Sequence, residues 1–209
     1  MNKIIIILII LFSCNYVFLE NIYGENSSIQ KQAANSNAAS AEYLKLRLDY
    51  SKSPEYNPYN IEVHDIMEEC YKLMDEGKSK EAIEKAKTGI TKDKYNIQLL
   101  IVLASAYRKI GDFENADKYR KLWVGLVNSI LTSGDGKSAE SAFTVISVDE
   151  EYAVLEVLQL MRVSQRYVVI DGANFDILEV KKEKTDDKFD LYFNINIPFN
   201  WLSKSVSSK

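Results

Sequence analysis

Residues 73–82 read Leu-Met-Asp-Glu-Gly-Lys-Ser-Lys-Glu-Ala, and residues 107–116 read Tyr-Arg-Lys-Ile-Gly-Asp-Phe-Glu-Asn-Ala. Each stretch places a glycine five residues before an alanine, and the two copies lie 34 residues apart. Cys70 and Ala104 match at the same spacing. Glycine accepts the left-handed backbone that ends a helix, and a small alanine lets two helices cross closely. We therefore predict two helical hairpins in tandem.

The period of 34 residues resembles the tetratricopeptide repeat, a unit of two antiparallel helices. The resemblance covers two units, at about 63–96 and 97–130, although Lys94 stands where that family usually has a proline. Each such unit buries its apolar flank against a neighbour. We therefore expect the helix at 112–131 and the C-terminal part of the chain to cap the pair. Coincidental spacing in two ordinary helical hairpins is the alternative.

Beyond the helical region the apolar period changes, and residues 133–203 predict a small α+β domain. Asp171-Gly172 is a hairpin-turn signal, and Ser147 with Glu150 fits a capping box that opens a helix. The apolar residues from Phe189 to Ile197 alternate with polar ones, which favours a strand with one buried face. The expected order is β-α-β-β-β with a mostly antiparallel sheet, made of strands 142–146, 166–170, 175–180 and 189–197 and a helix from Ser147 to about Met161. The fold class is therefore α+β.

The N-terminus is typical of an export signal. Lys3 precedes an unbroken apolar run from Ile4 to Phe12, which is too short to span a bilayer. The run ends in Leu11-Phe12-Ser13-Cys14, which resembles a bacterial lipobox with Cys14 as the acylated residue. We expect residues 1–13 to be a signal peptide and Cys14 to carry a lipid. A plain secretory signal that is cut further on, for example after Gly24, is the alternative.

Residues 14–42 are predicted to form a flexible tether, because the segment 20–42 has few large apolar residues and no sustained period. The predicted helical region then covers 43–132. With a lipid on Cys14, the only other cysteine is Cys70, which excludes a disulfide within the mature chain. The expected location is the bacterial cell envelope, periplasmic or surface, with the lipid as the only membrane contact.

Composition and motifs indicate no catalytic, metal or cofactor site. The net charge of −4 and the pI near 5.2 disfavour nucleic acid as a partner. His64 is the only histidine, so neither a catalytic triad nor a zinc site can be argued from it. Gly136-Lys137-Ser138 does not form a phosphate loop, because position 131 is a leucine where that motif needs a glycine.

The concave face of the predicted repeats offers a candidate contact surface. The first helix of each unit would place Met67, Tyr71, Ile101 and Arg108 on that face. Tyrosine, methionine and arginine are enriched at protein interfaces. Met67 and Tyr71 replace the lysine and asparagine that clamp a peptide carboxylate in one repeat variant, so that binding mode is not expected. Packing of these residues against 41–60 or the C-terminal domain is the alternative.

Several short motifs together resemble the bacterial domain-of-unknown-function 4919 family. They are Arg47-Leu48-Asp49-Tyr50, Pro54-Glu55-Tyr56-Asn57-Pro58-Tyr59, Gly134-Asp135-Gly136-Lys137-Ser138 followed by Ala142-Phe143, Ile146-Ser147-Val148-Asp149-Glu150-Glu151-Tyr152, Tyr192-Phe193-Asn194 and Pro198-Phe199-Asn200-Trp201. The resemblance covers the chain from about residue 44. It implies an exported bacterial protein with helical repeats and no assigned activity.

These observations favour a non-enzymatic envelope lipoprotein that binds a protein or peptide. The alternative is a hydrolase or carbohydrate-acting domain that uses acidic and aromatic residues, since the chain has thirteen tyrosines and two tryptophans. The two hypotheses differ in what they require of the structure. An enzyme of this kind needs a cleft with two converging carboxylates, and a binding module needs an exposed apolar patch or an open groove.

Overall fold

The computed structural model describes residues 37–182 and 186–207. The predicted signal peptide, Cys14 and the first part of the predicted tether lie outside these residues. Helix α3 (Asn37–Tyr50) begins inside the predicted tether, so that prediction is wrong for residues 37–42. Ser40, within this stretch, is already buried. Alanine also has the highest helix propensity, so a stretch rich in it is compatible with a helix.

The predicted helical hairpins are present. Helices α4 and α5 form the first hairpin and α6 and α7 the second, with bounds Ile61–Asp75, Ser79–Ile90, Ile97–Lys109 and Phe113–Leu131. Gly77 (φ +74°) and Gly111 (φ +82°) have left-handed backbones in the two connecting turns. Ala82 and Ala116 are both buried, as the close crossing of the helices requires. The tetratricopeptide assignment remains a prediction, because two helical hairpins alone do not establish it.

The C-terminal half is α+β, in the predicted order β-α-β-β-β with a helix added at the end. Its elements are β1 (Phe143–Thr144), α8 (Val148–Val157), β2 (Leu160–Ile170), β3 (Ala173–Lys182), β4 (Lys188–Asn194) and α9 (Asn196–Ser207). The strands lie in the order β1-β4-β3-β2. The β2–β3 and β3–β4 pairs are antiparallel, and the short β1 pairs with β4 in parallel. The sheet is therefore mixed but mostly antiparallel.

Two local predictions in this half need correction. Helix α8 ends at Val157 and β2 begins at Leu160, six residues before the predicted strand, because Gln159 turns the chain with φ +55°. The predicted last strand ends at Asn194, and Ile197 lies in α9. Pro198 in the first turn of α9 suits a helix start, since the missing N–H of proline has no helical partner there. The alternation of apolar and polar residues continues to Ile197, although the strand has already ended.

The predicted hairpin turn is confirmed. Asp171 (φ 51°) and Gly172 (φ 79°) both have left-handed backbones, and they join β2 to β3 through a two-residue turn. Two consecutive left-handed residues are the mark of the turn type that suits the twist of a β-hairpin.

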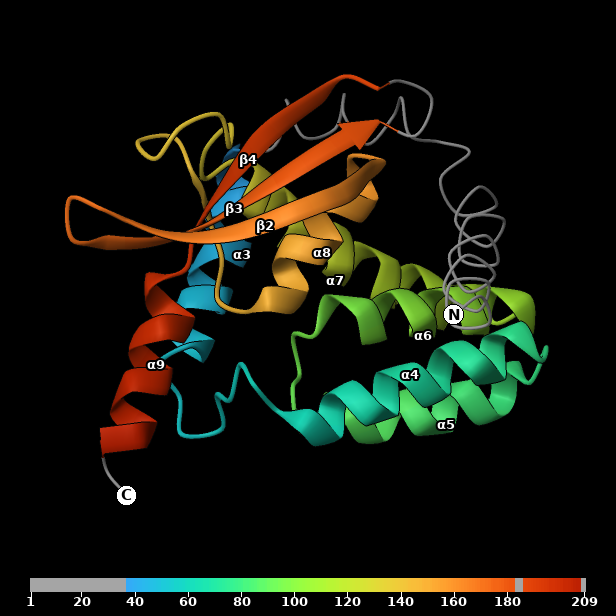
Figure 1. Ribbon diagram of the computed structural model, residues 1–209. Coiled ribbons are helices and arrows are strands. Elements are labelled where there is room, and N and C mark those ends of the chain that lie inside the picture. Colours follow the sequence, from blue (N-terminus) through green and yellow to red (C-terminus); the bar gives the residue numbers. More distant parts are fainter. Residues whose placement is uncertain (1–36, 183–185, 208–209) are drawn as a thin grey trace, which may run out of the picture.

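One hydrophobic core joins the helical hairpins to the sheet. It includes Leu100 and Ile101 of α6, Leu126 and Ile130 of α7, Val154 of α8, and a set of strand residues, Leu178, Val180, Leu191 and Phe193. Figure 1 shows α8 between the sheet and the α6–α7 hairpin, with α4 and α5 further from the sheet. Between residues 37 and 207, leaving out 183–185, no helix has the length and hydropathy needed to cross a membrane.

Candidate functional site

Segments that are far apart in the sequence meet at a junction between α3, the loop 51–60 and α8. Arg47 of α3 and Glu150 of α8 form a two-pronged ion pair, with Nε donating to Oε1 at 2.7 Å and Nη2 donating to Oε2 at 2.5 Å. The Arg47 side chain has no solvent exposure, and that of Glu150 is 4% exposed. The loop joins the junction through Tyr56, whose hydroxyl donates to the carbonyl of Ile146.

Arg47 donates two further hydrogen bonds. Its Nη1 donates to Ser129 Oγ at 3.1 Å, and its Nη2 donates to the carbonyl of Thr144 at 2.8 Å. A buried charge is tolerated when it is paired and its hydrogen bonds are made. Arg47 meets both conditions while it contacts α7, β1 and α8. It therefore fixes the position of α3 relative to the C-terminal half.

The predicted capping box is wrong in its contacts. Helix α8 does begin directly after Ser147, but the Ser147 side chain makes no capping hydrogen bond. The Glu150 carboxylate turns away from that role and accepts from the backbone N–H of Ile146 at 2.8 Å, beside its bond to Arg47. A charged partner binds a carboxylate more strongly than a neutral backbone N–H does. The motif that looked like a local helix start is therefore part of a long-range ion pair.

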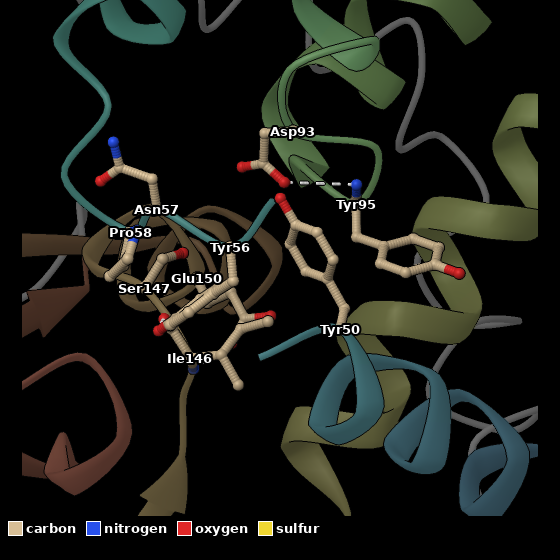
Figure 2. A pocket seen from close by; sticks show the side chains of 9 residues that line it. All are labelled: Tyr50, Tyr56, Asn57, Pro58, Asp93, Tyr95, Ile146, Ser147 and Glu150. Atoms are coloured by element: carbon tan, nitrogen blue, oxygen red, sulfur yellow. Dashed lines mark hydrogen bonds between the residues drawn. The ribbon is translucent and has the colours of Figure 1, made fainter. Parts of the chain in front are cut away.

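A cluster of tyrosines surrounds a small cavity at this junction. Figure 2 shows Tyr50, Tyr56 and Tyr95 around it, with the hydroxyl of Tyr50 near the carboxyl of Asp93. Tyr50 packs edge-on against both other rings, with centroids 5.8 Å and 5.3 Å away. The cavity measures about 10 Å³, which is room for about one water molecule. It is too small to hold a substrate.

Burial changes the acidity of the groups at this junction. It raises the pKa of Asp93 to about 6, although hydrogen bonds from Tyr50 and Asn96 oppose that shift. Burial also raises the pKa of Tyr50 and Tyr56 above the usual value, with the nearby carboxylates adding to the effect. The tyrosine hydroxyls therefore stay protonated and act as hydrogen-bond donors at physiological pH.

Two more carboxyl groups converge between α8 and β3. Glu151 is 1% exposed, and its Oε1 has no hydrogen-bond partner. Burial, followed by the charge of the nearby Asp176, raises the pKa of Glu151 to about 9. Asp176 is 8% exposed and accepts from Gln165 Nε2 at 3.0 Å, and burial raises its pKa too. Glu151 is therefore a neutral acid at pH 7.

A carbohydrate-acting enzyme would need two carboxyl groups at an accessible site, one protonated as the general acid and one ionised as the base or nucleophile. Here, however, both side chains are enclosed, so a substrate cannot reach Glu151 in this arrangement. In the described part of the chain, no three histidine, cysteine or acidic side chains are grouped to hold a metal ion. Cys70 is fully buried, and burial raises the pKa of its thiol to about 11, which suits a packing role.

The predicted contact residues do not form one open surface. Ile101 is 2% exposed and belongs to the main core, and Met67 and Tyr71 are half-buried. The hydroxyl of Tyr71 donates to Gln98, and Gln98 in turn donates to Glu156 of α8 at 3.1 Å. Helix α8 thus lies against part of the face that we expected to be a groove. Arg108 is exposed at the far end of α6.

An open hollow lies at that far end, where the two hairpin turns come together. It measures about 350 Å³ and is lined by Gly77, Lys78, Ser79, Lys80, Glu81, Lys109 and Ile110. Figure 1 shows the two turns next to each other, away from the sheet. Ile110 is 41% exposed, and Phe113, the first residue of α7, is 66% exposed. Our prediction of a contact surface on the concave helix faces missed this hollow. The sequence signal that could have indicated it is the pair of glycine-containing turns with lysines beside them.

Comparison with known proteins identifies the family. No curated protein and no solved structure matches the chain. The domain of unknown function DUF4919 matches residues 26–204, which is most of the chain. The match includes Arg47, Tyr56 and Glu150, which meet at the junction. The chain belongs to the DUF4919 family.

Proposed function

We propose that this protein is an exported, lipid-anchored envelope protein that acts by binding an acidic segment of a partner protein at the hollow between its two hairpin turns. The observation that supports binding is the contrast in size. The junction cavity has room for about one water molecule, whereas the open hollow measures about 350 Å³, enough for the side chains of a partner segment.

Charge decides the kind of partner. Three lysines and one glutamate line the hollow, and Arg108 lies next to Lys109. Ile110 and Phe113 add exposed apolar surface at the same turn. A partner segment with acidic residues around an apolar side chain matches both features. The anchor at Cys14 and the export signal rest on the residues before the described part of the chain.

The test uses the full chain expressed in bacteria, with two readouts. The first is incorporation of a labelled fatty acid, which we expect in the wild type and not in Cys14→Ala. The second is capture of envelope proteins by wild type and by Lys80→Glu with Lys109→Glu. We expect the charge reversal to weaken capture at least tenfold, because it replaces two attractive charges by two repulsive ones.

The matched control is Lys45→Glu with Lys121→Glu, which makes the same change in net charge at two exposed lysines of α3 and α7. Equal loss in both double variants would mean that net charge alone matters, and the hollow would not be the binding site. An unlabelled wild type would disprove the lipid anchor and leave the binding proposal standing.

A further inference from the structure

The sheet ends in a long strand whose outer edge is open. Strand β2 is the last in the order β1-β4-β3-β2, and among residues 37–182 and 186–207 no strand pairs with its other edge. The face of the strand that carries Tyr167 and Val169 is also exposed, with these side chains at 50% and 55% exposure. An unpaired edge of this kind presents a row of backbone donors and acceptors to another chain.

The part of β2 that leads to the hairpin turn, residues 164–170, lacks the usual features that protect an edge. Its pairing with β3 is regular, since the irregularity in register falls earlier, between Arg162 and Ser164. It contains no proline, lysine or acidic residue. Its one charge is Arg166, which is paired with Asp190 of β4, with Nη1 donating to Oδ1 at 3.3 Å. Natural edges are normally protected by such charges, prolines or bulges.

The sequence of this stretch suits pairing with itself. In an antiparallel pair, residues that lie opposite each other point to the same face of the sheet. When the two strands are identical and related by a two-fold axis, one residue must therefore lie opposite its own copy. Pairing centred on Arg166 sets two like charges directly opposite each other, which is destabilising. Pairing centred on Gln165 would extend into the irregularity between Arg162 and Ser164. Pairing centred on Tyr167 uses all of residues 164–170.

We infer that two copies of this chain associate through the outer edges of β2, antiparallel and centred on Tyr167. The two tyrosines then face each other, Arg166 lies opposite Val168, and Gln165 lies opposite Val169. Aromatic and β-branched cross-strand pairs are the favourable ones. The two four-stranded sheets join into one continuous sheet, and the dimer presents two hollows to partners.

Disulfide trapping in intact cells tests this pairing with the full chain. Tyr167→Cys places two thiols opposite each other, about 5 Å apart between their β-carbons, so oxidation should yield a cross-linked dimer. Ser164→Cys is the matched control. Its two copies would be six residues apart along the strands, or about 20 Å, and should stay monomeric under the same oxidation. Gln165→Cys reports the register, since it should link only if the pairing is centred on Gln165.

A second measurement uses a variant without an added cysteine. Tyr167→Lys sets two positive charges opposite each other at an exposed position, and we expect it to turn a dimer into a monomer in sedimentation of the detergent-solubilised full chain. A wild type that sediments as a monomer, or equal cross-linking of Tyr167→Cys and Ser164→Cys, would overturn the inference. Cross-linking of Tyr167→Cys to a different protein would show that another partner occupies the edge.

Discussion

Arg47→Ala should destabilise the protein by about 3–5 kcal/mol, because it leaves the carboxylate of Glu150 buried without its charged partner. The variant also loses the hydrogen bonds to Ser129 and to the carbonyl of Thr144. Urea unfolding of the wild type and the variant measures the difference. A loss of this size is a large part of the stability of a typical domain, so the unfolding midpoint of the variant should lie at a clearly lower urea concentration.

Arg166→Ala is the matched control, because it removes an arginine from an exposed ion pair with Asp190. The two side chains are 47% and 34% exposed, and such pairs contribute about 0–1 kcal/mol. The double variant Arg47→Met with Glu150→Leu removes both buried charges and should recover part of the stability that Arg47→Ala loses. Equal unfolding midpoints for Arg47→Ala and Arg166→Ala would contradict the role that we assign to the junction.

Stability should fall as the pH rises from about 5 to 9, and Glu151 should account for much of the fall. Burial raises the pKa of Glu151 to about 9 in the folded protein, while the unfolded chain ionises near the ordinary value of about 4.3. Below that ordinary value the group is protonated in both states and costs nothing. Above it only the unfolded state loses the proton, so the folded state is progressively disfavoured, by about 4 kcal/mol at pH 7.

Glu151→Gln replaces the acid by a neutral side chain of the same shape, so its unfolding free energy should depend less on pH than that of the wild type. Asp93, with a pKa of about 6, and Glu156, with a pKa of about 7, should keep a smaller dependence between pH 4 and 7. Urea unfolding at pH 5, 7 and 9 measures both slopes. Glu68→Gln, at a side chain that is 71% exposed, is the control. Parallel pH curves for the wild type and Glu151→Gln would show that Glu151 is not a neutral buried acid.

Local signals predicted much of the fold. The two glycines predicted the positions of both turns between helices, and Asp171-Gly172 predicted the β-hairpin turn, because a left-handed backbone favours particular residue types. The end of α8 escaped prediction, since Gln159 adopts a left-handed backbone that glutamine rarely takes. Helix α9 was not predicted, because the alternation of apolar and polar residues continues past the end of β4.

The site was harder to predict than the fold, because its contacts span long distances in the sequence. Arg47 and Glu150 are 103 residues apart, and the sequence around each of them gives no sign of the other as its partner. We predicted that the face carrying Ile101 would be an open groove. The sequence does not indicate that α8 lies against α6, because that contact depends on tertiary packing. The hollow depends on two turns that lie side by side only in the folded chain.

Site-specific photo-crosslinking in intact cells tests most directly whether the protein acts by binding at the hollow. A photoreactive phenylalanine analogue replaces Phe113 beside the hollow or, as the control, Val206 on α9; the two side chains are 66% and 68% exposed. We predict that the probe at position 113 links the chain to another envelope protein, and that Lys80→Glu with Lys109→Glu abolishes the product. A probe at position 206 that gives the same product, or a product at position 113 that survives the charge reversal, would contradict binding at the hollow.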